Sequence, residues 1–245
     1  MKGFILAGGL ATRLQPLTLV TNKHLLPVYK KPMIFYALES MQRAGIEEVL
    51  LSSSPDHAGQ FTSLIKDGAD FGLRMYYTVQ SKPGGIAEAI LLAEDFAKQD
   101  TLLVLLGDGI FSHSLKPDIE KFEKKEKGAM TFGMHMPTES KQYGVIEMDE
   151  TGKVLSIEEK PEHPKSDIAQ TGIYMYDTRV FDFIRDLKPS ARGELEVTDL
   201  NNRYVAEGTM ECSVLPWWID AGTSHDELLR ANNLVAEKVN SGGFE

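Results

Sequence analysis

Two glycines and an arginine follow the first apolar run of the chain, a pattern that could bind phosphate. In Leu6-Ala7-Gly8-Gly9 the apolar run ends in the glycine pair, and Arg13 stands four residues further on. Adjacent glycines let backbone N–H groups approach phosphates and base edges, and a guanidinium suits phosphate oxygens. The spacing fits neither a P-loop nor a dinucleotide-binding glycine loop, so a plain turn with a surface arginine stays open. Lys23, one short loop away, favours the phosphate interpretation.

A carboxylate stands after a second apolar run. Leu102–Leu106 is wholly apolar, as is typical of a strand buried on both faces, and Asp108 follows it between two glycines. Ligands of open α/β sheets bind at the carboxyl ends of strands, where this aspartate can reach a Mg²⁺ that also binds phosphate oxygens. A turn aspartate is the alternative. Asp220, just before an expected helix, is a candidate second metal ligand or a helix cap.

Two later segments are weaker signals when taken alone. Lys160 could place a point charge on a phosphate and Glu159 could bind sugar hydroxyls, although Glu-Glu-Lys is more often a solvated strand end. Residues 192–196 also combine an arginine with two glutamates. Other catalytic patterns do not fit: the six histidines lack zinc spacing, no G-x-S-x-G segment is present, and Cys212 has no neighbouring base.

Composition and charge exclude several function classes. The 245 residues include 26 Lys and Arg against 36 Asp and Glu, a formal net charge of −10, which argues against general affinity for nucleic acid or anionic lipid. A single cysteine cannot form an internal disulfide. The sequence shows no signal segment and no apolar run long enough to span a bilayer, so we expect a cytoplasmic protein.

The elements that must position these residues follow an alternating pattern. Short apolar runs alternate with helical patterns up to Lys127, which predicts βαβ units and a parallel sheet. Strands are expected at 4–7, 49–51, 75–79, 102–106, 130–136, 145–148, 154–158 and 172–176, and helices after Pro32, from about His57, around 86–93, at 178–187 and from Ser224. Ser224 and Glu227 fit a capping box. We expect one α/β domain over 1–245, a nucleotide-binding core at 1–127 with an elaboration at 128–245 that binds the second substrate.

Read in order, these motifs resemble the sugar-1-phosphate nucleotidyltransferases, from Lys2 to about Val239. The matching segments are Gly8-Gly9-x-x-Thr12-Arg13-Leu14, Lys23-x-Leu25-Leu26-Pro27, Gln80 with Gly85, Leu106-Gly107-Asp108, Tyr143-Gly144-Val145, Glu158-Glu159-Lys160-Pro161, Thr171-Gly172-Ile173-Tyr174, Arg192-Gly193-Glu194-Leu195-Glu196 and Trp218-Ile219-Asp220-x-Gly222-Thr223. The resemblance implies a Rossmann-like, three-layer αβα fold with a mixed, mostly parallel central sheet. It is strongest with the branch that transfers a thymidylyl group from dTTP to glucose-1-phosphate, giving dTDP-glucose and pyrophosphate, the first step of dTDP-rhamnose-type sugar biosynthesis.

The resemblance also implies roles for individual residues. Arg13, Lys23 and Lys160 would be catalytic, and Asp108 and Asp220 would bind Mg²⁺. The implied nucleotide-binding residues are Leu6, Gly8, Gly9, Leu10, Arg13, Lys23, Gln80, Pro83, Gly85 and Asp108. The implied sugar-phosphate-binding residues are Tyr143, Gly144, Glu159, Lys160, Gln170, Thr171, Gly172 and Arg192. We expect the metal and the basic side chains to share one cleft.

Three residues depart from the family pattern: His24 replaces a glutamine, Gly109 an asparagine, and Gln170 an apolar residue beside the sugar. A transferase that uses UTP or another sugar-1-phosphate therefore stays open, as does a non-catalytic, nucleotide-sensing subunit of the same fold. Family members commonly form tetramers, so we expect a homo-oligomer. Longer members continue with a helical tail that contributes to a feedback nucleotide site, and we expect that site to be absent or rebuilt.

Overall fold

A computed structural model describes residues 1–9, 11–82 and 84–244 of the chain. It consists of two compact units, each assembled from separate segments. The first unit comprises Gly3–Pro83, Leu105–Lys116 and Trp217–Glu245, and the second comprises Met1–Lys2, Gly84–Val104 and Pro117–Pro216. The chain passes between the units within β6 (Leu102–Leu106) and α5 (Lys116–Phe122).

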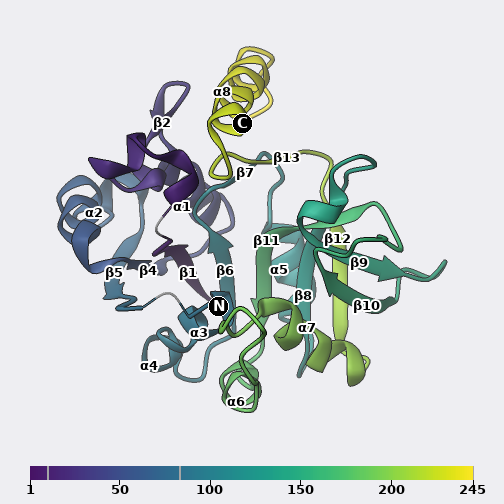
Figure 1. Ribbon diagram of the computed structural model, residues 1–245. Coiled ribbons are helices and arrows are strands. Elements are labelled where there is room, and N and C mark those ends of the chain that lie inside the picture. The colour runs from purple at the N-terminus through teal and green to yellow at the C-terminus, as the bar shows by residue number, and fades with distance from the viewer. Residues whose placement is uncertain (10, 83, 245) are drawn as a thin grey trace. The chain divides into compact units, whose positions relative to one another are not determined.

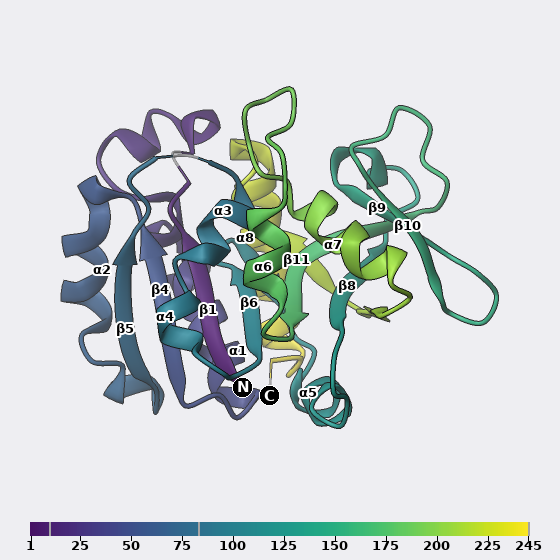
Figure 2. The same ribbon diagram turned by 90° about the horizontal axis from the view of Figure 1, so that it is seen from below.

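The first unit contains a parallel sheet. Strands β1 (Lys2–Ala7), β4 (Glu48–Ser53) and β5 (Arg74–Val79) lie side by side, with Gly3 opposite Val49 and Glu48 opposite Arg74. The apolar side chains of β1 and β4, and Met75 of β5, are buried because helices α1 (Met33–Arg43) and α2 (Ala58–Ile65) pack against the sheet. Figure 2 shows the three strands in this order, with α2 beside β5. The parallel arrangement brings the carboxyl ends of the three strands to one edge.

Short elements complete the first unit. They are η1 (Thr12–Leu14), η2 (Leu17–Leu19), η3 (Lys23–Leu25), η4 (Pro55–His57), η5 (Ala69–Phe71), β2 (Pro27–Val28), β3 (Lys31–Pro32), β7 (Gly109–Phe111) and β13 (Trp218–Asp220). Strands β7 and β13 form an antiparallel pair in which Asp220 stands opposite Gly109. The last helix, α8 (His225–Asn240), buries Ala231 and Val235 in a core with Ile110 and Ile219. This packing fixes the β7–β13 pair.

The second unit contains a mixed sheet. Strand β11 (Ile168–Tyr176) pairs antiparallel with β8 (Ala129–His135) and β9 (Gly144–Met148), β10 (Val154–Glu159) pairs antiparallel with β9, and β12 (Met210–Val214) runs parallel to β8. Helix α7 (Val197–Ala206) packs against β8, β10 and β12 (Figure 1). The remaining elements are α3 (Ile86–Leu91), α4 (Glu94–Ala97), α6 (Val180–Arg185) and η6 (Ser140–Gln142).

Most predicted elements are confirmed, with some differences. One half of the expected capping box is confirmed, because Glu227 N donates to Ser224 Oγ at 3.1 Å. The helix expected around 86–93 is divided into α3 and α4. Strand β11 begins four residues before Gly172, earlier than predicted. The prediction missed this start because the residues before that glycine are polar, although they are buried. Helix α7 was not predicted, although Val197, Leu200 and Tyr204 have the spacing of one helix face. The division at 127 stays a prediction.

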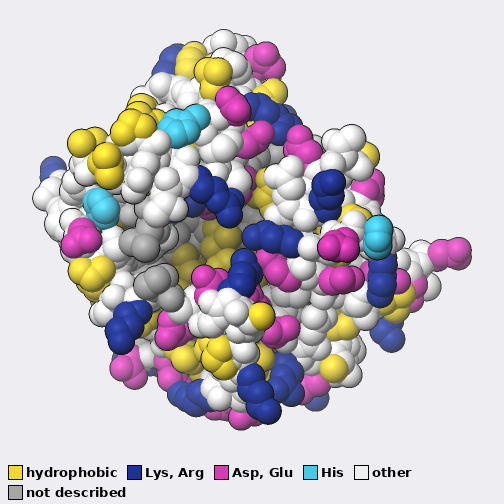
Figure 3. Space-filling view, viewed as in Figure 1, with side chains coloured by type: hydrophobic (Ala, Val, Ile, Leu, Met, Phe, Trp, Pro, Cys, Tyr) yellow, Lys and Arg dark blue, Asp and Glu magenta, His cyan; other side chains and the backbone are white. Residues whose placement is uncertain are grey.

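The surface carries mixed charges. On the face drawn in Figure 3, the basic side chains are interspersed with acidic and uncharged ones. Hydrophobic side chains gather over η2 and the residues after it, where Leu17, Leu19 and Val20 are exposed. Among the described residues, no helix is both long and apolar enough to cross a membrane.

Candidate active site

The glycine pair lies where β1 ends, beside the end of β5. Gln80 directly follows β5, and its backbone N–H donates to Ser53 O at 2.9 Å. A Cβ on Gly8 would lie 2.7 Å from Gln80 Oε1, so the glutamine side chain lies against the Gly8 backbone. Leu6 is buried within β1, whereas the space around Gly9 is open. Gly8 and Gln80, two predicted nucleotide-binding residues, therefore lie against each other. Leu10 and Pro83, two predicted nucleotide-binding residues, lie outside the described residues.

Lys23 and Asp108 form an ion pair whose side chains are only 16% and 15% exposed. Lys23 begins η3, and the side chain of Asn22 caps that turn by accepting from His24 N at 2.9 Å. Asp108 follows β6 at a turn where Gly107 N donates to Leu6 O at 3.0 Å. Two segments 85 residues apart in sequence thus place opposite charges together at the sheet edge.

His24, a departure from the family pattern, is buried next to Lys23. It is 2% exposed, and its Nδ1 lies 2.7 Å from Asn22 Oδ1. Burial, with the adjacent Lys23 charge, lowers the pKa of His24 to about 3, so the ring is neutral and Nδ1 carries the donated proton. Asn22 in turn donates to Ala7 O at 3.1 Å. This chain of contacts ties the Lys23 turn to the end of β1.

Asp220 joins Asp108 through the β7–β13 pair. Ala221 N donates to Asp108 O at 3.0 Å, and Gly222 N donates to Asp220 Oδ1 at 2.8 Å. Asp220 ends β13 instead of lying in the expected loop. A cavity of about 270 Å³ is lined by Ala11, Thr12, Arg13, Lys23, Asp108, Asp220, Gly222 and Thr223. The first unit therefore brings together both predicted metal ligands and both predicted triphosphate-binding cations.

The donor set of this cavity suits a hard divalent cation. Burial, with the neighbouring Asp108 charge, raises the pKa of Asp220. Burial alone would also raise the pKa of Asp108, but the Lys23 ammonium and the hydrogen bonds to this carboxylate together lower that pKa. A cation would relieve the repulsion between the carboxylates. Among the described residues no group of three or more candidate ligands occurs, so phosphate oxygens and water would complete the coordination.

Gly222 is required by this close approach. A Cβ at this position would lie 2.6 Å from Asp108 Oδ2 and 2.8 Å from Lys23 Nζ. Gly222→Ala is expected to lower the free energy of unfolding by about 1–3 kcal/mol, the usual cost of overpacking. Gly59→Ala is the control, since Gly59 lies in α2 with open space around it and alanine is the better helix former. Urea unfolding measures both; equal stability of the two variants would contradict the packing argument.

In the second unit, three charged side chains gather at the end of β10. Lys160 Nζ and Arg192 Nη2 each lie 3.6 Å from Glu159 Oε1. Lys160 has a left-handed backbone (φ 46°) and its N–H donates to Tyr143 O at 3.0 Å. A lysine held in this conformation is strained, which is common at functional sites. The structure thus brings together three of the predicted sugar-phosphate-binding residues, Glu159, Lys160 and Arg192.

The other predicted sugar-site residues lie on β9 and β11. Gly144 begins β9 and stands opposite Glu159 of β10. Gln170 and Thr171 are buried in β11, and Gly172 (φ 74°) lies where the β11–β8 register shifts. Only glycine adopts that φ without strain. All of these residues belong to the second unit, together with Lys160 and Arg192.

The family model for nucleotidyl transferases matches residues 2–238, nearly the whole chain. The chain belongs to this family. Among its relatives, a glucose-1-phosphate thymidylyltransferase from Neisseria gonorrhoeae is 44% identical over 91% of this chain and 78% of its own. Another of that name, from Mycolicibacterium smegmatis, is 44% identical over 96% of this chain and 82% of its own.

One solved structure supports the same membership, and a second shows the same fold. A Bacillus anthracis protein, provisionally assigned as a glucose-1-phosphate thymidylyltransferase and solved with sucrose, is 45% identical, covers 96% of this chain and 94% of its own, and has a TM-score of 0.90. A UDP-glucose pyrophosphorylase with UDP-glucose is 23% identical over 97% of this chain and 98% of its own, with a TM-score of 0.84, and shows the fold alone. The expected Rossmann-like αβα fold with a mixed, mostly parallel sheet is confirmed.

The positions of Gly85 and Thr198 were not expected from the sequence. Gly85 (φ 95°), predicted to bind the nucleotide, belongs to the second unit, where a Cβ would lie 2.4 Å from Leu195 O. Thr198 was not singled out, yet its Oγ1 donates to Glu159 Oε2 at 2.9 Å. Thr198 could have been found from the sequence, because it follows the Arg192–Glu196 motif directly and stands at the start of a helical pattern.

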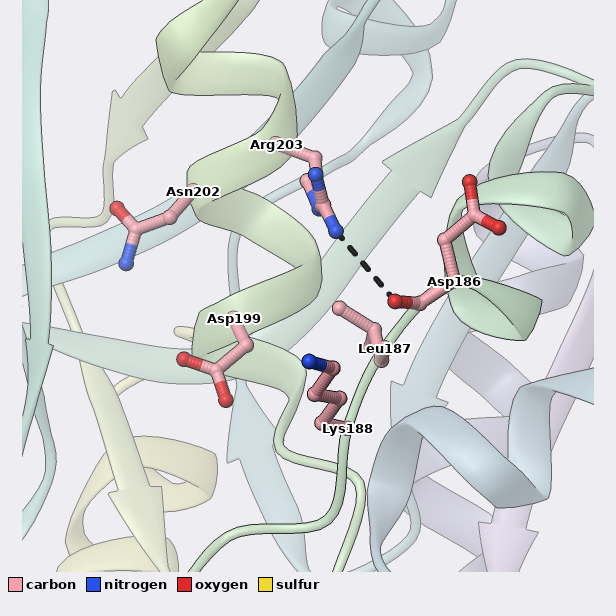
Figure 4. A pocket seen from close by; sticks show the side chains of 6 residues that line it. All are labelled: Asp186, Leu187, Lys188, Asp199, Asn202 and Arg203. Atoms are coloured by element: carbon pink, nitrogen blue, oxygen red, sulfur yellow. Dashed lines mark hydrogen bonds between the residues drawn. The ribbon is translucent and has the colours of Figure 1, made fainter.

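A larger cavity of about 360 Å³ lies elsewhere in the second unit (Figure 4). Its lining consists of Asp186, Leu187, Lys188, Asp199, Asn202 and Arg203. Arg203 Nη2 donates to Asp186 O at 3.4 Å. Asn202 Oδ1 accepts from Ile157 N at 3.1 Å, and Asn202 Nδ2 donates to Ile157 O at 2.7 Å. None of the predicted site residues lines it. Its acidic and basic side chains are mixed and exposed, so it does not match the charge pattern of a phosphate site.

Proposed function

We propose that this nucleotidyl transferase family member transfers a thymidylyl group from dTTP to glucose-1-phosphate, giving dTDP-glucose and pyrophosphate. The observation that carries the proposal is the first unit's cavity, where Arg13 and Lys23 lie with the carboxylates of Asp108 and Asp220. A triphosphate needs basic side chains, and its metal ion needs carboxylates. The thymidine preference rests on relatives named glucose-1-phosphate thymidylyltransferase, 41–44% identical to this chain.

The first unit would bind the nucleotide. In this proposal the backbone of Gly8 and Gly9 and the side chain of Gln80 contact the thymine nucleotide, since Gln80 lies against Gly8. Arg13 and Lys23 bind the triphosphate and stabilise the negative charge on the departing pyrophosphate. The remaining predicted nucleotide contacts, Leu6, Leu10, Pro83 and Gly85, stay predictions.

The second unit would bind the sugar phosphate. Lys160 and Arg192 bind its phosphate, and Glu159, Gly144, Thr171 and Gly172 line the sugar, with Tyr143 and Gln170 beside them. Support comes from the gathering of Lys160 and Arg192 around one carboxylate oxygen of Glu159. Thr198 binds the other oxygen and so orients that carboxylate. The expectation that all four basic side chains share one cleft stays a prediction.

The reaction needs no enzyme nucleophile. A phosphate oxygen of glucose-1-phosphate attacks the α-phosphorus of dTTP in line; a new P–O bond forms, and the α–β bridging bond breaks with its electron pair leaving on pyrophosphate. The attacking oxygen is already anionic, so no general base is required. The chain's contribution is to align two mutually repelling anions and to offset their charge with Arg13, Lys23, Lys160 and Arg192.

Asp108 and Asp220 would hold Mg²⁺. Their partly buried carboxylates are hard oxygen ligands, and burial together with repulsion from Asp108 raises the pKa of Asp220, a repulsion that a cation would remove. When bound, Mg²⁺ would supply positive charge to the phosphate oxygens. Lys23, paired with Asp108, would keep that carboxylate ionised for the metal. A cytoplasmic location and a homotetramer also stay predictions, based on the family resemblance.

A uridylyltransferase is the alternative, since the thymine methyl is worth only roughly 1 kcal/mol in a pocket. The decisive experiment measures pyrophosphate release with dTTP or UTP and with glucose-1-phosphate, glucosamine-1-phosphate or galactose-1-phosphate, in the presence of Mg²⁺. We expect the highest kcat/KM for dTTP with glucose-1-phosphate. Higher kcat/KM with UTP would favour the uridylyltransferase, and no release with any pair would favour a nucleotide-sensing subunit.

A further inference from the structure

Gln170 is a buried polar side chain between β9 and β8. It is 5% exposed, and its Nε2 donates a hydrogen bond of 3.0 Å to Oγ1 of Thr131, which is itself 0% exposed. Glutamine is seldom buried without a polar partner for each end of its amide. The contact with Thr131 fixes the side chain, and with it the position of the other amide atom, Oε1.

The fixed oxygen lies over the backbone of Gly144. A Cβ on Gly144 would be 2.4 Å from Gln170 Oε1, so only glycine leaves room for the amide there. Within residues 1–9, 11–82 and 84–244, Oε1 accepts no hydrogen bond. Oε1 is not among the buried, unpartnered side-chain atoms of the described residues, so this oriented acceptor can be reached from outside the protein and a ligand donor can bind to it.

A second acceptor flanks the same glycine. Glu159 of β10 stands directly opposite Gly144, while Gln170 comes from β11 on the other side of β9. Thr198 donates to one carboxylate oxygen of Glu159 and so fixes its orientation. Two oriented acceptors on either side of one backbone position suit a ligand with several hydroxyl donors, which a hexose has and a simple phosphate lacks.

We propose that Gln170 Oε1 accepts a hydrogen bond from one hydroxyl of the hexose 1-phosphate and makes the enzyme selective for sugars that carry this hydroxyl. The inference rests on the proposed function. An apolar side chain could exclude water here but could not distinguish a hydroxyl from a hydrogen atom. An oriented acceptor disfavours the deoxy sugar, because that sugar displaces water from the acceptor without supplying a donor in its place.

The test compares the full-length enzyme with Gln170→Met, which keeps the length of the side chain and removes both polar atoms. kcat/KM is measured with dTTP, Mg²⁺ and glucose-1-phosphate or its 2-, 3-, 4- or 6-deoxy analogue. We expect the unmodified enzyme to disfavour one deoxy analogue by about 10–100-fold through this contact, and Gln170→Met to lose that discrimination while the other ratios stay unchanged.

The outcomes separate this inference from the proposed function. No pyrophosphate release by the unmodified enzyme contradicts the proposed function. An active enzyme whose deoxy-sugar ratios are the same in Gln170→Met, or shift together for all analogues, overturns the role of Gln170. If Gln170→Met does not fold, Thr131→Val is tested instead, because valine keeps the shape of threonine and removes the hydroxyl that accepts from Gln170 Nε2. Loss of discrimination against that one deoxy analogue in Thr131→Val supports the inference, and unchanged kcat/KM ratios overturn it.

Discussion

Asp108→Asn is expected to lower kcat for pyrophosphate release by on the order of 10³, the largest effect at this site. The change keeps the shape of the side chain but removes the charge that pairs with Lys23 and, in the proposed function, binds Mg²⁺. Asp70→Asn is the matched control, because Asp70 is an exposed aspartate in η5 of the same unit. The measurement is kcat at saturating dTTP and glucose-1-phosphate over a range of Mg²⁺ concentrations.

Loss of the ion pair must be separated from loss of the metal ligand. Lys23 is mostly buried, and removing its partner leaves an uncompensated charge, so Asp108→Asn is also expected to lower the free energy of unfolding by about 3–5 kcal/mol. The double variant Lys23→Met with Asp108→Asn restores charge balance and should recover much of that stability, yet stay inactive. If Asp108→Asn alone kept full kcat at low Mg²⁺ concentration, Asp108 would not be a metal ligand.

The main strands and the position of Asp108 were predictable because their signals are local. A wholly apolar five-residue run is typical of a strand buried on both faces, and β6 indeed ends at Leu106, two residues before Asp108. The meeting of Asp108 and Asp220 was expected only by resemblance. It depends on β7 and β13, three-residue strands too short to show any alternation of apolar side chains.

Three features could not be predicted from the sequence because they depend on backbone conformation or on contacts between distant segments. Nothing local indicates that Lys160 takes a left-handed φ, since that conformation is imposed by the contact of its N–H with Tyr143 O. Gly85 was assigned to the nucleotide from its motif, but its φ and the nearby Leu195 backbone also give it a packing reason. The orientation of Gln170 likewise depends on Thr131, which is 39 residues away in sequence.

Lys160→Ala is expected to lower kcat/KM for glucose-1-phosphate by about 10²–10³, while KM for dTTP changes little. The lysine ammonium lies beside Arg192 around Glu159 Oε1, where in the proposed function it binds the sugar phosphate. Lys165→Ala is the control, since Lys165 is another exposed lysine of the second unit and pairs with Glu147. Steady-state kinetics with each substrate varied in turn makes the measurement.

The left-handed backbone at Lys160 allows the charge to be separated from the fold. Lys160→Gly removes the same ammonium but relieves a conformation that costs a non-glycine residue roughly 1–2 kcal/mol. Lys160→Gly should therefore lose as much kcat/KM as Lys160→Ala while unfolding at an equal or higher urea concentration. Because its side chain is 46% exposed, the lysine contributes little to stability by its ion pair. Activity retained by Lys160→Gly would mean that the left-handed turn, and not the ammonium, is what the reaction needs.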